Sequence, residues 1–120
     1  MSREQMPANV KALRVPPHSI DAEQAVLGGL MLNEHAWDRI ADKLGEDDFY
    51  RGEHRIIFRA IADLKQQNKP FDAVTLGEWF EANNLAEAAG GVSYIVQLAN
   101  ATPSAANIGA YADIVREKSV

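Results

Sequence analysis

Apolar side chains recur at intervals of three and four residues along most of this chain. The interval is clearest in three segments whose apolar residues occupy positions i, i+3, i+4 and i+7: Trp37, Ile40, Ala41 and Leu44; Ile57, Ala60, Ile61 and Leu64; and Val92, Ile95, Val96 and Ala99. Such spacing places the apolar side chains on one face of an α-helix. No segment alternates with a period of two, so we expect no strands. The pattern therefore predicts an all-α fold.

Residues that favour helix ends divide this pattern into separate helices. Ser19 and Asn33 are good N-caps, and Glu23 in the first turn after Ser19 suits the positive end of a helix dipole. Thr75 followed by Glu78 has the spacing of a capping box. We expect a small bundle of about six helices, at about residues 19–32, 34–44, 52–67, 75–83, 91–99 and 104–119.

The last predicted helix is apolar on two opposite sides. One stripe packs on the domain and consists of Ile108, Tyr111, Ala112 and Val115. Nearly opposite it lies a second stripe of small or apolar residues, Ala106, Ala110 and Ile114. Because a domain covers only one side of a surface helix, we expect the second stripe to associate with another segment or subunit.

Composition suggests one domain preceded by an arm. The chain has 120 residues, of which 47% are hydrophobic and 24% charged, enough for one core. Residues 1–18 show no periodicity and carry Arg3, Lys11 and Arg14 against Glu4, so we expect a flexible basic arm before an acidic body. No cysteine, signal peptide or apolar stretch of membrane-spanning length is present, which favours a cytoplasmic location and no membrane contact.

Two glycine pairs lack the sequence of a phosphate-binding loop. Neither Gly28-Gly29 nor Gly90-Gly91 is followed by the lysine that holds phosphates in nucleotide-hydrolysing proteins. Because Gly28-Gly29 lies inside a predicted helix, it indicates close approach by another helix, and Gly90-Gly91 indicates a turn. We expect no catalytic residue and no cofactor in this chain.

The histidines offer little for metal binding or catalysis. His18, His35 and His54 lie in different predicted elements, without the spacing of a helical metal pair, so we expect no metal site. Glu53 beside His54, or Asp38 near His35, has the composition of an acid–base pair. No nucleophile motif accompanies either pair, so a small acid–base enzyme is the weaker alternative and surface pairing the better one.

Arg51, Arg55 and Arg59 are spaced by four residues and form a basic ridge on the third predicted helix, opposite its apolar stripe. Such a ridge is suited to neutralising phosphates or to docking on an acidic protein, although helices often carry such charges for solvation alone. Direct nucleic-acid binding through this ridge is the main alternative function, and the acidic body opposes it.

Four blocks in this chain resemble the amino-terminal domain of bacterial DnaB-type replicative helicases. They occur in the family's order and comprise residues 16–29, residues 48–58, Gly90-Gly91-Val92-Ser93-Tyr94, and residues 102–118. The resemblance implies a small all-helical domain, non-catalytic in itself, that assembles a collar on a hexameric ring and docks primase. It also implies that residues 104–120 begin a helical hairpin through which subunits pair, after a globular domain of residues 19–103.

By the same resemblance, Tyr94 is part of the surface that communicates with primase. The implied partners are a second copy of the chain, primase and a helicase loader, with weak or no direct DNA binding by this segment. The implied ATP and Mg²⁺ belong to a RecA-like ATPase motor that lies outside the 120 residues. Nothing catalytic transfers to these residues by the resemblance.

Overall fold

The computed structural model describes residues 18–119, and the regular secondary structure within that range is entirely helical. No strand occurs among these residues, which confirms the all-α prediction. In chain order the elements are α2 (Ile20–Leu32), the 3₁₀ turn η1 (Glu34–Ala36), α3 (Trp37–Ile40), the 3₁₀ turn η2 (Glu46–Asp48), α4 (Gly52–Gln66), α5 (Ala73–Ala82), α6 (Val92–Ala101) and α7 (Ile108–Ser119). The predicted arm, residues 1–18, lies outside the described residues except for His18.

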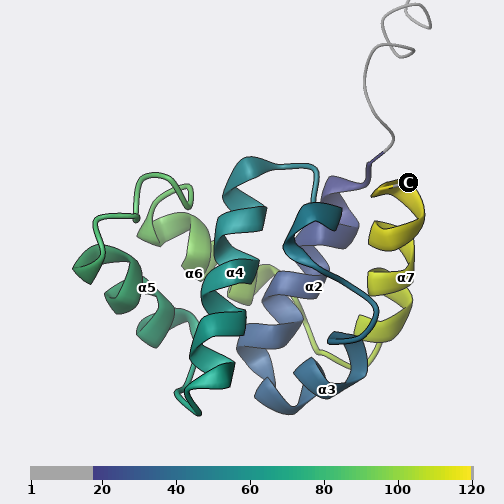
Figure 1. Ribbon diagram of the computed structural model, residues 1–120, viewed down its shortest axis with the longest axis horizontal. Helices are drawn as coiled ribbons and strands as arrows, with labels where there is room; N and C mark the ends of the chain where they lie inside the picture. The colour runs from purple at the N-terminus through teal and green to yellow at the C-terminus, as the bar shows by residue number, and fades with distance from the viewer. Residues whose placement is uncertain (1–17, 120) are drawn as a thin grey trace, which may run out of the picture.

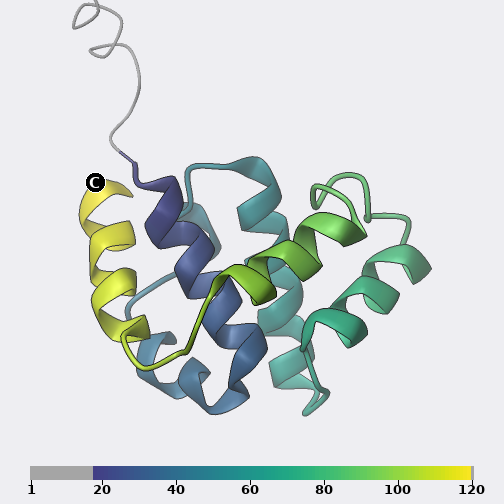
Figure 2. The ribbon, with the colours of Figure 1, turned by 180° about the vertical axis from the view of Figure 1, so that it is seen from behind.

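Helix α2 lies at the centre of the bundle. It contacts α4, α6 and α7, and Figures 1 and 2 show α7 on one side of it and α4 and α6 on the other. Ser19 caps it as predicted, since the Ser19 hydroxyl accepts from the Ala22 amide at 3.3 Å. Its buried apolar residues are Ala22, Val26, Leu27, Leu30 and Met31.

The glycine pair in α2 is where two other segments approach its backbone, as the sequence predicts. A Cβ added at Gly28 would lie 2.1 Å from Thr102 Oγ1 and 2.5 Å from the Leu98 carbonyl oxygen. At Gly29 it would lie 3.2 Å from Ile108 Cδ1. The absence of both side chains therefore lets α6 and the start of α7 pack directly on α2.

Helices α5 and α6 pack together with Phe71, Leu76, Phe80, Ile95 and Leu98 buried. Two expectations here are wrong. The N-cap of α5 is Asp72, whose side chain accepts from the Thr75 amide at 2.9 Å, so the Thr75 capping box does not form. On α6, Val96 is 40% exposed and Leu98 is buried in its place.

Helix α7 carries the two different sides that its sequence predicts. Ile108, Ala112 and Val115 are at most 1% exposed against the core, whereas Ile114 is 38% exposed. The helix begins at Ile108, so Ala106 lies in the preceding turn and not on the outer stripe of α7. The turn forms because Ser104 accepts from the Ala106 amide at 3.2 Å while Ala105 is buried beneath it.

The second predicted helix is shorter than expected. Asn33 caps it as predicted by accepting from the His35 amide at 3.0 Å. Its first turn is the 3₁₀ turn η1, α3 ends at Ile40, and residues 41–43 form a turn closed by the Lys43 amide on the Ile40 carbonyl at 2.9 Å. Leu44 is nevertheless buried, so the predicted apolar stripe packs although the helix has ended.

Candidate functional site

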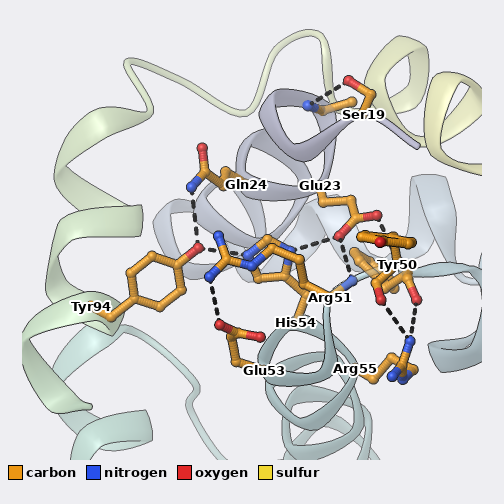
Figure 3. A network of polar contacts seen from close by, with 11 residues as sticks. Ser19, Glu23, Gln24, Tyr50, Arg51, Glu53, His54, Arg55 and Tyr94 are labelled. Carbon is orange, nitrogen blue, oxygen red and sulfur yellow. Dashed lines mark hydrogen bonds and ion pairs between the residues drawn. The ribbon is translucent and has the colours of Figure 1, made fainter. Parts of the chain in front are cut away.

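A buried polar cluster joins α2, α4 and α6. Glu23 on α2 is 1% exposed and His54 on α4 is 0% exposed, so both side chains lie inside the apolar core. Tyr94 on α6 and Gln24 on α2 complete the cluster, and Figure 3 shows the four side chains converging from the three helices. Buried polar groups require partners, and each of these groups has one.

Glu23 receives N–H donors from two directions. The backbone amides of Tyr50 and Arg51 donate to its two oxygens at 2.7 and 3.4 Å, and His54 Nδ1 lies 2.7 Å from Oε1. The carboxylate therefore holds the chain segment before α4 against α2. These hydrogen bonds offset the free-energy cost of burying the carboxylate.

The hydroxyl of Tyr94 lies at the other nitrogen of His54. Nε2 is 2.6 Å from it, and Gln24 Nε2 donates to it at 3.1 Å. The rings of His54 and Tyr94 are stacked, with centroids 5.9 Å apart and planes 7° apart. The half-buried Tyr94 ring is thus fixed by its hydroxyl and by its face.

Arg51 and Glu53 lie at the outer edge of this cluster. The Arg51 guanidinium lies over the Tyr94 ring, 5.7 Å from its centroid, and donates to the Glu53 carboxylate. The Glu53 backbone N–H and the Arg51 guanidinium lower the pKa of that carboxyl below its ordinary value of 4.5. The same hydrogen bond to Glu53 raises the pKa of Arg51.

The three arginines of the predicted ridge each have partners within the domain. Arg55 donates to the carbonyl oxygens of Phe49 and Tyr50 at 2.8 and 2.9 Å. Arg59 lies 3.8 Å from Glu46 in a solvent-exposed ion pair, and Arg51 contacts Glu53 and Tyr94. Two of the three guanidinium charges are therefore paired with carboxylates.

Glu53 and His54 form neither the surface pair that the sequence analysis favoured nor the alternative acid–base pair. Glu53 bonds Arg51, and the carboxylate at His54 is Glu23. His54 has no exposed surface, and its second nitrogen faces a phenol. Among residues 18–119 no group of three or more potential metal ligands occurs, and no helix in that range has the length and apolarity to cross a bilayer.

The outer side of α7 lines a shallow groove of about 460 Å³ with the start of α2 and the segment before α7. Tyr111 and Ile114 supply its side on α7, and Ala25, Ala101 and Pro103 supply other apolar lining. Ala110 is exposed on α7, and Ala106 is exposed in the turn before it. Of the predicted association residues, Ile114 is therefore the one at the groove.

The family comparison agrees with this architecture. The DnaB-like helicase N terminal domain model matches residues 15–117. The chain belongs to this family. The replicative DNA helicase DnaB of Haemophilus influenzae is 47% identical over 106 residues, which are 88% of this chain and 23% of that protein. The replicative DNA helicase DnaC of Bacillus subtilis is 44% identical over 107 residues, 89% of this chain and 24% of that protein.

A solved structure gives the same result for the DnaB-type fold. The crystal structure of the N-terminal domain of DnaB helicase from Mycobacterium tuberculosis superposes with a TM-score of 0.83 at 40% identity, covering 87% of this chain and 72% of that chain. This chain spans about a quarter of the length of the curated relatives described above. Its all-α fold is that of the DnaB-like helicase N terminal domain family.

Two residues of the buried cluster in this DnaB-type domain, Glu23 and Gln24, are not identified from the sequence. The position of Glu23 in the first turn suggests only a helix-dipole role, although Glu23, Val26, Leu27 and Leu30 follow the i, i+3, i+4, i+7 pattern of the buried face. An acidic residue on such a stripe signals a buried carboxylate with a polar partner. The identity of that partner, His54, depends on the tertiary fold.

Proposed function

We propose that this chain is the non-catalytic assembly and primase-docking domain of a hexameric, ATP-dependent replicative DNA helicase that acts in the cytoplasm. It associates with other copies through the outer side of α7, and it docks primase through a surface that includes Tyr94. A helicase loader is a further partner. ATP and Mg²⁺ belong to a RecA-like motor domain outside these 120 residues.

The observation that carries this proposal is the contrast between two consecutive residues of α7. Val115 is 1% exposed and Ile114 is 38% exposed, so one apolar side chain remains partly exposed beside a groove while its neighbour fills the core. Because only 38% of Ile114 is exposed, burying the remainder against another copy would contribute about 0.5 to 1 kcal/mol. A face of this kind is typical of an association surface.

Direct nucleic-acid binding is less well supported. Arg51 and Arg59 already contact Glu53 and Glu46, and the net charge of the whole chain is −5. Affinity for phosphates grows with the number of uncompensated cations, so we expect weak binding to single-stranded DNA that declines further with salt. If the chain bound single-stranded DNA tightly and in a salt-sensitive way, and lost this binding when Arg51, Arg55 and Arg59 were substituted, direct nucleic-acid binding would be the better proposal.

The assembly part is tested by sedimentation of the chain across a range of concentrations. We expect self-association that Ile114→Asp weakens at least tenfold while the melting temperature changes by a few degrees at most, because the side chain is outside the core. Val74→Asp is the matched control, since Val74 is an exposed apolar residue on α5, 73% exposed. Equal association of wild type and Ile114→Asp would refute the assignment of this surface.

The docking part is tested by titrating purified primase into the chain. We expect saturable binding that Tyr94→Ala weakens at least tenfold, whereas Val74→Asp leaves it unchanged. Both Tyr94→Ala and wild type are examined by circular dichroism, so that loss of fold is recognised. Absence of primase binding by the folded wild-type chain would refute the docking role.

A further inference from the structure

The hydroxyl of Tyr94 points into the domain. Its two neighbours, His54 Nε2 at 2.6 Å and Gln24 Nε2 at 3.1 Å, come from α4 and α2 (Figure 3). The phenol therefore ties α6 to two other helices. The ring is half-buried, and its stacking partner, His54, is fully buried.

The partners of His54 indicate the direction of the hydrogen bonds that its ring makes. Glu23 accepts from two backbone amides and, as a carboxylate, offers only acceptors, so Nδ1 of His54 carries the proton that faces it. With that single proton on the ring, Nε2 of His54 has a lone pair, which accepts the Tyr94 O–H. Gln24 donates its amide N–H to the Tyr94 oxygen.

In this assignment the Tyr94 hydroxyl donates its only proton to His54, so it has no proton to donate to a partner. A partner approaching α6 therefore meets the ring of Tyr94 and the Arg51 guanidinium that lies over it at 5.7 Å. Arg51 is itself held by Glu53 through its side chain and by Glu23 through its backbone amide. Glu23 thus contacts both the segment that carries Arg51 and the histidine that fixes Tyr94.

We infer that Glu23 and His54 are positioning residues that hold the Tyr94 ring and the Arg51 guanidinium as one preformed docking face, with the Tyr94 hydroxyl acting as its internal anchor. This inference rests on the proposed docking role of Tyr94. It adds that two side chains with almost no exposed surface determine the affinity for the partner without touching it. The affinity for the partner rises because the Tyr94 ring and the Arg51 guanidinium are already fixed before binding, whereas ordering mobile side chains opposes association.

The test distinguishes the contact made by Nδ1 of His54 from the contact made by Nε2. His54→Asn keeps a donor near the Nδ1 position for Glu23 but has no group to reach Tyr94, and His54→Gln provides an acceptor near the Nε2 position. With purified primase as the probe, we expect His54→Asn to weaken docking about tenfold and His54→Gln to recover most of that loss. Gln66→Met, an exposed change elsewhere on α4, is the control and leaves docking unchanged.

A double-mutant cycle identifies the contact that matters. Because Tyr94→Phe and His54→Asn remove the two sides of one hydrogen bond, the double variant is expected to dock about as weakly as either single variant. Additive losses, or docking by His54→Asn equal to that of wild type, would overturn the inference. All variants are compared at temperatures where circular dichroism shows them folded.

A spectroscopic measurement tests the same geometry without any partner. The nitrogen chemical shifts of the His54 ring are expected to show the Nδ1–H tautomer, and Tyr94→Phe is expected to shift the Nε2 resonance. An Nε2–H tautomer in the wild type would overturn the inference. If primase fails to bind the wild type, the proposed function fails, while these resonances still decide whether the hydroxyl is the anchor.

Discussion

Adding one methyl group at Gly28 is the sharpest test of how α6 packs on α2. In Gly28→Ala the new Cβ would lie 2.1 Å from Thr102 Oγ1 and 2.5 Å from the Leu98 carbonyl oxygen. The threonine side chain is able to rotate, but the carbonyl belongs to the α6 backbone. Relief of the overlap therefore requires α6 to move away from α2 along its buried length.

The magnitude follows from two opposing effects. Overpacking of a dense core destabilises by about 1 to 3 kcal/mol, and more where the backbone has to shift. Replacing glycine by alanine inside a helix stabilises the helix by about 1 kcal/mol. We expect a net loss of about 2 kcal/mol in the free energy of unfolding, which is roughly a 10 °C fall in melting temperature for a domain of this size.

The assay is thermal unfolding followed by circular dichroism, with two matched controls. At Gly45 an added Cβ meets nothing within 4 Å, so Gly45→Ala is expected to be neutral or slightly stabilising. At Gly29 the nearest atom is the end of the Ile108 side chain at 3.2 Å, so Gly29→Ala has an intermediate effect. Equal melting temperatures for Gly28→Ala and Gly45→Ala would refute the direct packing of α6 on α2.

Four further outcomes are expected. Val115→Asp places a charge where only 1% of the side chain is exposed, so it lowers the free energy of unfolding by about 3 kcal/mol or more in denaturant titrations. Asp72→Ala removes the cap of α5 and lowers stability by about 1 kcal/mol in the same titrations; no change would show that the cap is dispensable. Because the folded-state pKa of Glu53 is lowered, its contribution is complete above its ordinary pKa of 4.5 and is lost as pH falls through the folded-state value, so Glu53→Gln gives a flatter acid-stability profile. The purified chain shows no ATP hydrolysis in a phosphate-release assay, and robust turnover would contradict the sequence analysis.

Local signals in the sequence predicted the elements that depend on local interactions. Ser19 and Asn33 cap helices as expected, because an N-cap is determined by residues within one turn. The Gly28-Gly29 pair correctly indicated close packing, since glycine weakens a helix interior and is favoured there where a neighbouring segment needs the space. The contrast between Ile114 and Val115 followed from helical periodicity alone.

The wrong expectations arose where two local signals competed. Asp72 and Thr75 are both good N-caps, and Asp72 prevails because α5 begins at Ala73 with its Thr75 amide bonded to that carboxylate. Periodicity placed Ala106 on α7, whereas Ser104 accepts its amide and holds it in a turn. Val96 was expected to be buried and Leu98 is buried instead, because a short apolar helix fits more than one apolar stripe.

The candidate site could be predicted only in part. The family resemblance indicated Tyr94 as part of a docking surface, and its ring is half-buried. Its hydroxyl partner and the carboxylate beyond it are far apart in sequence, and no periodicity links α2, α4 and α6. Such pairings depend on how helices pack in three dimensions, which the sequence pattern of any one helix does not specify.

The central position of α2 has a consequence for how the chain is synthesised. This helix emerges first among the described elements, yet its partners α6 and α7 are near the other end of those elements. At about 5 to 20 residues per second, the apolar face of α2 waits several seconds on the ribosome before the helices that cover it exist. Folding of the domain is therefore completed only after α6 and α7 have emerged.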